Sequence, residues 1–299
     1  MRYASKVGFV ARFLVALAVV AGSIGPAAAQ KRPAAPSLFS QENAMAWCIV
    51  PYDSQQRTPA QRIAMLKTLG FSQYAYDWRP KHLDSFGEEL RLAKENGIAV
   101  AAVWIWIDQQ YDKLGKLSAN NQRMLDILKA SGMRTRIWVG FNGNFFENLD
   151  ENAKIDKGVA MLRFLRQKVP ANVTGLGLYN HGDWFGEPEN QIKILKVLKD
   201  RRVGLVYNFH HAHEQLDRFP AMLAQMRPWL WTVNLSGLRK GGPKIMPLGS
   251  GDRELDMMRL VQDSGFKGTI GVLGHIEEED VQQVLQRNLD GLRKLEQQL

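Results

Sequence analysis

The stretch from Gly177 to Asn190 reads Gly-Leu-Tyr-Asn-His-Gly-Asp-Trp-Phe-Gly-Glu-Pro-Glu-Asn and indicates which kind of fold the chain adopts. The apolar run 174–179 predicts a buried strand, and it leads into a loop of polar and aromatic residues. Pro188 then suits the first turn of a helix, where its missing N–H costs nothing. A buried strand that ends in a polar loop before a helix is how α/β enzymes position catalytic groups.

The same alternation of strand and helix runs through the rest of the chain. Runs that are apolar throughout are typical of parallel strands buried on both faces. We expect strands at 45–50, 73–77, 98–107, 135–141, 174–179, 203–209, 230–235 and 269–273. Amphipathic stretches follow each of them and predict helices at 58–70, 85–96, 118–131, 151–168, 188–200, 214–226, 253–264 and 279–299.

Eight such units in a row, with no strand pair joined by a tight hairpin, predict an α/β fold that is a single (β/α)8 TIM barrel. A doubly wound open sheet is the alternative, but it would leave the last units without a clear partner. The chain has no Gly-x-Gly-x-x-Gly after its first strand and no Gly-Lys-Ser/Thr phosphate loop, so neither nucleotide-binding motif is present.

The first 29 residues read as a secretory signal peptide. A basic start precedes the apolar run 13–24, which is shorter than the ~20 residues that span a bilayer, and Ala27-Ala28-Ala29 fit a cleavage site. We therefore expect a signal peptide at 1–29, a linker at 30–43 and the barrel domain at 44–299. The protein would be exported to the periplasm or secreted, without stable membrane insertion after cleavage. An uncleaved membrane anchor is the alternative.

Charge and cysteine content argue against a nucleic-acid-binding protein and against a disulfide-bonded one. The chain has 39 Lys+Arg against 30 Asp+Glu, and the signal peptide holds three of the basic residues and no acidic one, which leaves a mature net charge of +6. The basic residues form no concentrated stripe, so we expect no nucleic-acid partner. Cys48 is the single cysteine, so an intramolecular disulfide is impossible, and its apolar surroundings predict a buried thiol.

Polar residues gather where the predicted strands end, which in a barrel is the active-site face. Five of the six histidines fall at these ends, and four successive strands each end on an asparagine. Amides both donate to and accept from hydroxyl groups, and tryptophans stack on sugar faces, so the set predicts a carbohydrate site. The expected substrate-binding residues are Asn142, Asn180, Asn208, Asn234, Trp106, Trp184, His210 and His275.

The histidines also suggest a catalytic base. We expect His181 or His211 to act as general base, with Glu187 or Asp183 as its partner. Glu187 has the alternative role of favouring the dipole of the following helix. Whether a cofactor is present stays open: a divalent metal ion would use His181 and His211, but the chain has no His-Glu-x-x-His motif.

The chain resembles the xylose isomerase-like TIM barrels of the sugar phosphate isomerase/epimerase superfamily, and is closest to their exported bacterial branch. The resemblance spans 44–299 and is carried by the motifs at 178–182, 186–190, 206–211 and 247–252. It implies a barrel that binds a sugar and, in members of known chemistry, a divalent metal that assists proton transfer next to a carbonyl.

The resemblance also implies that the metal-ligand positions are altered. The fifth-strand Glu of the family falls on Tyr179 or Asn180, the sixth-strand Asp on Asn208, and the seventh-strand His on Asn234, while the His of the sixth-strand motif stands as His211. The eighth-strand Glu falls on 273 or 274. Because hard cations favour anionic oxygen, the metal mechanism is not expected to carry over.

Three functions stay open on the sequence. The first is a carbohydrate-active isomerase, epimerase or lyase that moves a proton next to a carbonyl. The second is a non-catalytic carbohydrate-binding barrel that has lost the metal site, and the third is a metal-dependent hydrolase. In each of the first two the partner is a small-molecule carbohydrate. The oligomeric state is not indicated by the sequence.

Overall fold

The computed structural model describes Met1 and residues 37–299. The predicted signal peptide beyond Met1, and residues 30–36 of the predicted linker, lie outside the described residues, so these stay predictions. In the remainder of the predicted linker, Phe39 is fully buried in the core, and Asn43 donates hydrogen bonds to the carbonyls of Leu38 and Gly268. The packed domain therefore begins before the first strand.

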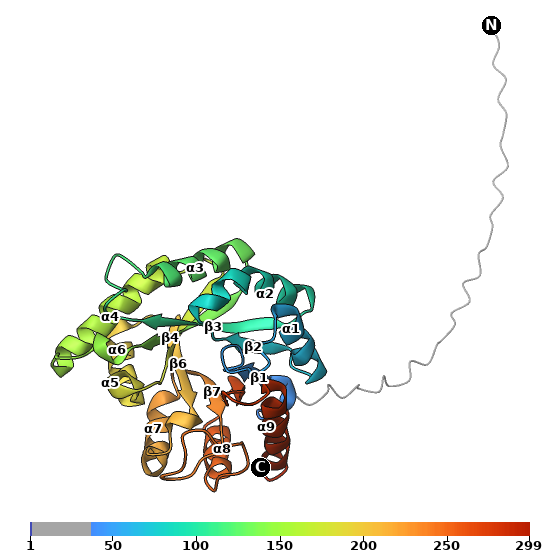
Figure 1. Cartoon of the computed structure of the whole chain (residues 1–299). Helices are drawn as coiled ribbons and strands as arrows, with labels where there is room; N and C mark the ends of the chain where they lie inside the picture. Colours follow the sequence, from blue (N-terminus) through green and yellow to red (C-terminus); the bar gives the residue numbers. More distant parts are fainter. Residues whose placement is uncertain (2–36) are drawn as a thin grey trace. The chain divides into compact units, whose positions relative to one another are not determined.

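The strands close into a parallel barrel in sequence order, which confirms the predicted fold (Figure 1). The first and last strands close the ring, with Ala44 opposite Ile270 and Trp47 opposite Leu273. The strands are β1 (Ala44–Trp47), β2 (Gln73–Tyr76), β3 (Ala99–Ile107), β4 (Thr135–Phe141), β5 (Val173–Tyr179), β6 (Val203–Asn208), β7 (Leu230–Leu235) and β8 (Thr269–Leu273).

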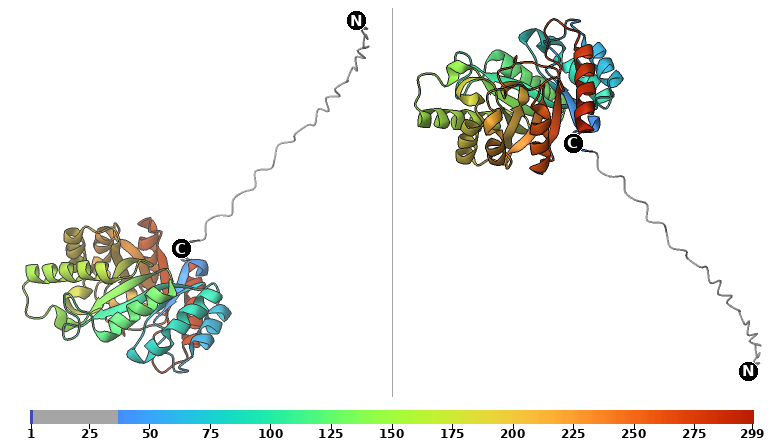
Figure 2. Two further views of the ribbon diagram at one scale, coloured as in Figure 1. Left: turned by 90° about the horizontal axis from the view of Figure 1, so that it is seen from above. Right: turned by 90° about the horizontal axis from the view of Figure 1, so that it is seen from below.

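Helices surround the barrel and connect successive strands (Figure 2). They are α1 (Pro59–Thr68), α2 (Leu83–Glu95), α3 (Ala119–Ser131), α4 (Glu151–Lys168), α5 (Asp183–Gly186), α6 (Pro188–Leu198), α7 (Phe219–Met226), α8 (Glu254–Asp263) and α9 (Val281–Glu296). None of the helices in the described part of the chain is long and apolar enough to cross a membrane.

Local sequence explains where two of these helices begin. Thr58 caps α1 through a capping box with Gln61, and Pro188 opens α6, both as the sequence predicts. The helix predicted at 214–226 instead begins at Phe219. The preceding residues form two short 3-10 turns, and the Gln215 side chain is committed to the Tyr207 hydroxyl and to Glu187, so this segment is shaped by tertiary contacts.

The barrel has two apolar layers because side chains alternate along each strand. Residues such as Leu178 and Tyr207 belong to the layer between strands and helices, whereas Tyr179 and Val206 point into the barrel. The inner layer is rich in aromatic side chains, with Trp47, Trp104, Trp138 and Tyr179 all buried.

The large inner side chains fit because glycines stand opposite them. Trp106 pairs in register with Gly140, where a Cβ would come within 2.3 Å of the indole ring. Asn234 likewise pairs with Gly271, where a Cβ would lie 2.1 Å from the Asn234 Oδ1. A Cβ never approaches a neighbour this closely, so the bulky inner residues require glycine on the next strand.

Candidate functional site

Tyr179 is the central residue of the strand-end face. Its ring lies against four tryptophans and two histidines from other strands and loops, with the nearest tryptophan, Trp104, at 5.5 Å between ring centroids. The other neighbours are Trp138 at 5.8 Å, Trp106 at 6.1 Å, Trp47 and His211 at 6.3 Å, and His181 at 6.4 Å. Burial raises the pKa of the phenol, so the tyrosine stays neutral and fills the middle of the barrel.

Three of the predicted asparagines form a chain of hydrogen bonds across β5, β6 and β7. Asn234 Nδ2 donates to Asn208 Oδ1 at 2.6 Å, and Asn208 donates to Asn180 Oδ1 from its amide and, at 2.9 Å, from its backbone N–H. All three side chains are at most 1% exposed. The structure brings these predicted substrate-binding residues together, but most of their hydrogen bonds are to one another. Asn180 Nδ2 and Asn234 Oδ1 have no hydrogen-bond partner.

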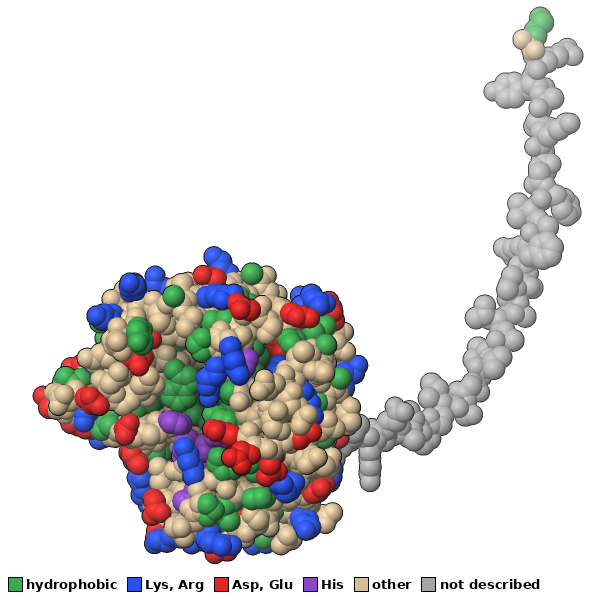
Figure 3. All heavy atoms as spheres, in the orientation of Figure 1, with side chains coloured by type: hydrophobic (Ala, Val, Ile, Leu, Met, Phe, Trp, Pro, Cys, Tyr) green, Lys and Arg blue, Asp and Glu red, His purple; other side chains and the backbone are tan. Residues whose placement is uncertain are grey.

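The histidines form a second cluster beside this amide chain. The rings of His181 and His211 lie 4.6 Å apart, and His210 packs 3.7 Å from His211. His181 also contacts Trp106, at 5.0 Å. The space-filling view shows histidines near the middle of this face, beside basic and apolar side chains (Figure 3).

The histidines are held in their neutral form. Burial, with the charge of Lys244, lowers the pKa of His181. Burial lowers the pKa of His211 to about 2 and that of His275 to about 4, and it lowers the pKa of His210 as well. A neutral imidazole accepts a proton on one nitrogen and donates from the other. Of these four histidines, His181 is the one whose pKa is not lowered far, so it is the best base.

A cavity of about 700 Å³ opens beside this cluster, over the ends of β2 and β3. Its wall carries aromatic faces and polar groups together, namely Tyr52, Trp78, Arg79, Trp106, Asp108, Asn142 and His181. Trp78 is fixed because its indole N–H donates to the Trp104 carbonyl at 2.8 Å. The volume and the mixed lining suit a ligand of sugar size.

Of the predicted site residues, Asn142 lines this cavity and His275 packs on one of its lining residues. Asn142 is exposed and donates to Asp108 Oδ2 at 2.7 Å. His275 stacks on Tyr52 with 3.5 Å between ring centroids. The Tyr52 hydroxyl accepts a hydrogen bond from Arg79 at 2.9 Å, so loops after β1, β2 and β8 meet in one layered contact.

The two acidic residues predicted as partners of the catalytic base, Glu187 and Asp183, do not line this cavity. Glu187 is at the start of α6, where it forms an ion pair with Arg218 and accepts hydrogen bonds from Gln215. This arrangement agrees with its alternative role at a helix start. Asp183 begins the short helix α5 close to Gly143, and Trp184 donates to Glu151 and packs on Phe146. Asp183 and Trp184 line a smaller, separate cavity of about 270 Å³.

Asp77 was not among the predicted site residues, although it stands at the end of β2. Its Oδ1 accepts from the backbone N–H groups of Ile49 and Val50, both at 3.2 Å, and its buried Oδ2 has no hydrogen-bond partner. Burial raises the pKa of Asp77 to about 7. Arg79, which lines the cavity, was also missed, because it lies in a loop, where sequence gives no signal of which way a side chain points.

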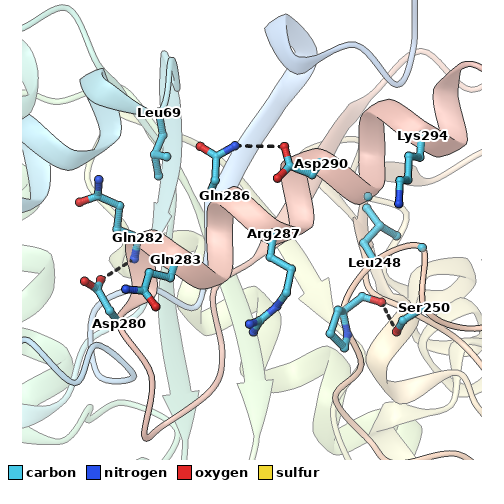
Figure 4. A pocket seen from close by; sticks show the side chains of 13 residues that line it. Leu69, Leu248, Ser250, Asp280, Gln282, Gln283, Gln286, Arg287, Asp290 and Lys294 are labelled. Carbon is cyan, nitrogen blue, oxygen red and sulfur yellow. Dashed lines mark hydrogen bonds between the residues drawn. The ribbon is translucent and has the colours of Figure 1, made fainter.

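A further cavity, of about 790 Å³, is a different feature (Figure 4). It lies along the outer face of α9, against the loop that carries Leu248 and Ser250. Several of its polar groups bond to one another or to nearby backbone, as in Gln286 to Asp290 and Ser250 to the Pro247 carbonyl. Because the cavity does not include the strand ends, we do not assign the chemistry to it.

The residues present do not fit the divalent metal that the fold family implies. Among the described residues, no group of three or more His, Cys, Asp or Glu side chains is placed to hold a metal ion. Asn208, which the resemblance puts at the family's aspartate position, bonds to other amides through both of its side-chain polar atoms. His181 and His211 alone make a pair, so no step of the chemistry is routed through a metal.

Comparison with known proteins supports the fold. No family model matches the sequence, and no curated protein matches it. Among solved structures, the apo form of the 3-keto-D-glucoside 4-epimerase YcjR from E. coli matches with a TM-score of 0.65 and 17% identity, over 85% of this chain and 99% of that chain.

Two further solved structures agree. The probable 3-DHS dehydratase AsbF from Bacillus anthracis has a TM-score of 0.64 and 12% identity, over 83% of this chain and 98% of that one. D-psicose 3-epimerase from Clostridium cellulolyticum H10, solved with D-tagatose, matches with a TM-score of 0.61 and 11% identity. The match covers 85% of this chain and 98% of that chain. At these identities the likeness shows the fold alone, which is the (β/α)8 barrel that the sequence predicted.

The amide chain predicts a cost for charge at its centre. The fully buried side-chain amide of Asn208 donates a hydrogen bond to Asn180 Oδ1. In Asn208→Asp a carboxylate oxygen, which only accepts, would face this Asn180 oxygen, which also accepts. We expect a loss of about 2–4 kcal/mol in the free energy of unfolding, measured by urea denaturation at pH 7. The exposed Asn120→Asp is the control, with a change within about 0.5 kcal/mol. Equal stability of the two variants would contradict a buried chain.

Asp77 predicts a pH-dependent stability. Because its folded pKa lies near 7 and the ordinary value is 3.8, the folded state keeps a proton that the unfolded state releases, so this contribution to stability is lost as pH rises from about 4 to 7. Asp77→Asn removes the effect while keeping an acceptor for Ile49 and Val50. Its stability relative to the wild type should therefore rise by about 3 kcal/mol between pH 5 and 8. Parallel pH profiles for the two proteins would show that Asp77 ionises normally.

Proposed function

We propose that the barrel binds a sugar or sugar derivative at its strand-end face and moves a proton next to the carbonyl of that ligand, as an isomerase or epimerase does. The observation that carries the proposal is His181, a neutral imidazole on the wall of a sugar-sized cavity. A base of this kind operates near neutral pH without needing a charged partner.

The cavity supports a carbohydrate ligand in particular. Trp78 and Trp106 give apolar surface for the C–H face of a sugar ring, and Asp108 and Asn142 give polar atoms for its hydroxyl groups. The neighbours with the same fold include epimerases that act on a 3-keto-D-glucoside and on D-psicose, by their names. A keto sugar is therefore the ligand class that we carry to this chain.

The histidines have different proposed roles because they differ in burial. His181 lines the cavity and is the proposed base. The His211 ring packs 4.6 Å from that of His181, burial lowers its pKa to about 2, and its buried Nε2 has no hydrogen-bond partner, so it is a very weak base. A neutral N–H of His211 or His275 is suited to donate a hydrogen bond to the oxygen on which charge develops.

A second candidate is a non-catalytic carbohydrate-binding barrel. The observation that favours it is the amide chain, because the strand-end positions of β5, β6 and β7 hold neutral side chains that are already paired with one another. This candidate keeps the cavity and the tryptophans but assigns no proton transfer. The two candidates differ in whether a bound keto sugar exchanges hydrogen with water.

Exchange in D2O tests the proposal directly. Each of D-fructose, D-psicose, D-tagatose and a 3-keto-glucoside is incubated with the protein in D2O, and deuterium uptake is measured by mass spectrometry. The wild type should introduce deuterium next to the carbonyl of at least one of these sugars. His181→Gln should slow this exchange by about 100-fold or more. His211→Gln should slow it less, because His211 would donate a hydrogen bond rather than take the proton. His82→Gln is the control, since Gln can still accept from the Arg79 backbone N–H.

The pH dependence of the exchange supplies an independent check. A base with a lowered pKa stays unprotonated to lower pH, so the rate should be flat through neutral pH and fall only below the value of about 6.5 at which an ordinary histidine titrates. Exchange that is unaffected by His181→Gln would remove the assignment. Sugar binding without any exchange by the wild type would favour the binding barrel.

A further inference from the structure

The 700 Å³ cavity extends away from the barrel axis along the loop that follows β3. Its inner end carries His181 and Trp106, whose rings lie 5.0 Å apart, and Trp106 packs on Tyr179 in the centre of the barrel. Its outer end carries Tyr111 and the first residues of α3. The proposed base is thus at one end of the cavity, and the loop 108–118 is at the other.

Tyr111 differs from the other aromatic residues of the cavity wall in its exposure. Its side chain is 58% exposed, whereas Tyr52, Trp78 and Trp106 are half-buried. Among the described residues, it is the only exposed aromatic side chain. A phenol combines an apolar ring face with a polar hydroxyl group, so at the mouth of a cavity it is suited to pack on a ring of a polar ligand.

The buried carboxylate of Asp112 fixes the loop that carries Tyr111. One of its oxygens accepts from the Ser118 backbone N–H at 2.8 Å and from Asn121 Nδ2 at 3.0 Å, and the other accepts from the Asp108 backbone N–H at 3.2 Å. The Tyr111 N–H donates to the Asp108 carbonyl at 3.0 Å. Because both ends of the loop bond to one carboxylate, its backbone is ordered before a ligand binds, which lowers the entropy cost of binding.

The outer end of the cavity offers neutral groups to a ligand. The Asp112 carboxylate is buried and bonded within the loop, and the lining residues beside it include Ser118 and Asn120, which carry a hydroxyl and an amide group. Such groups both donate to and accept from the hydroxyl groups of a ligand. Together with the ring of Tyr111, they suit an uncharged ring.

The volume of the cavity is also larger than one sugar ring requires. Pockets of about 300–1,000 Å³ bury ligands of drug size, which are larger than a monosaccharide, and this cavity of about 700 Å³ lies well within that range. A single ring held against Trp106 and His181 fills only the inner end. The outer end therefore has room for a second ring.

We propose that Tyr111 is a stacking platform for a second ring of the ligand, so that this protein binds a glycoside in preference to a free monosaccharide. The sugar that carries the carbonyl would lie at the inner end, beside His181. The ring attached to it, either a second sugar or an aromatic aglycone, would lie on Tyr111. The inference rests on the proposed sugar site, but it concerns binding alone and makes no use of proton transfer.

Calorimetric titration of the purified protein with matched ligands tests the platform. One series is methyl β-D-glucoside, phenyl β-D-glucoside and cellobiose, and the other is methyl β-D-galactoside, phenyl β-D-galactoside and lactose. Within a series the first sugar is the same, and only the attached group differs. We expect a two-ring ligand of at least one series to bind about tenfold more tightly than its methyl glycoside. The better of the two shows whether the second ring is a sugar or an aromatic group.

Variants of the loop then assign this preference to the Tyr111 ring. Tyr111→Ala removes an exposed side chain, so the fold should stay intact, and the two-ring ligand should bind only about as tightly as its methyl glycoside. Tyr111→Phe keeps the ring and should keep the preference.

Leu114 supplies the matched control for these variants. It is 62% exposed on the same loop, but it lines a different cavity, of about 420 Å³, beside Phe145 and Lys157. Leu114→Ala should therefore leave the preference for two rings unchanged.

Two results would overturn the platform. One is that no two-ring ligand binds more tightly than its methyl glycoside, whether or not binding is measurable. The other is a preference for two rings that survives Tyr111→Ala. The proton-transfer proposal is judged separately, because it depends on deuterium uptake and on the His181 variants. Deuterium exchange without a preference for two rings would leave that proposal standing and remove the platform.

Discussion

The packing of Tyr179 inside the barrel is the constraint on which the rest of the site depends. Its ring is surrounded by tryptophans from β1, β3 and β4, and these large side chains fit only because glycines stand opposite, as Gly140 does for Trp106. Close packing of this kind leaves no room for a ligand or an ion on the barrel axis. The open space is therefore displaced to one side, over β2 and β3, where the 700 Å³ cavity lies.

The same constraint determines the character of the polar groups around the aromatic centre. A charge buried beside packed aromatic rings is costly unless it is paired, so neutral groups are favoured there. Asn180, Asn208 and Asn234 hydrogen-bond to one another, and the neighbouring histidines are kept unprotonated by burial. Charged side chains, Arg79 and Asp108 among them, line the cavity beside this centre. The site thus changes from an apolar centre to neutral polar groups and then to charged side chains on the cavity wall.

The sequence was sufficient for the fold because each strand is an apolar run and each helix is amphipathic, so periodicity alone counts the βα units. It was also sufficient to place the asparagines and histidines at the strand ends, since the ends of parallel strands share one face. The sequence did not reveal what each of these side chains contacts. Asn208 and Asn234 bond to each other rather than face open space, and Glu187 pairs with Arg218. Those outcomes depend on side-chain direction and on loop contacts between residues far apart in the chain.

We infer that this site is built from neutral amides and imidazoles in place of a bound cation. The most direct measurement is elemental analysis, by inductively coupled plasma mass spectrometry, of protein purified without chelators and after dialysis against divalent Mg, Mn, Co, Ni and Zn. We expect much less than one ion per chain for every metal, and the same low content in a variant that carries both His181→Gln and His211→Gln. About one tightly held ion per chain, lost in that variant, would contradict it.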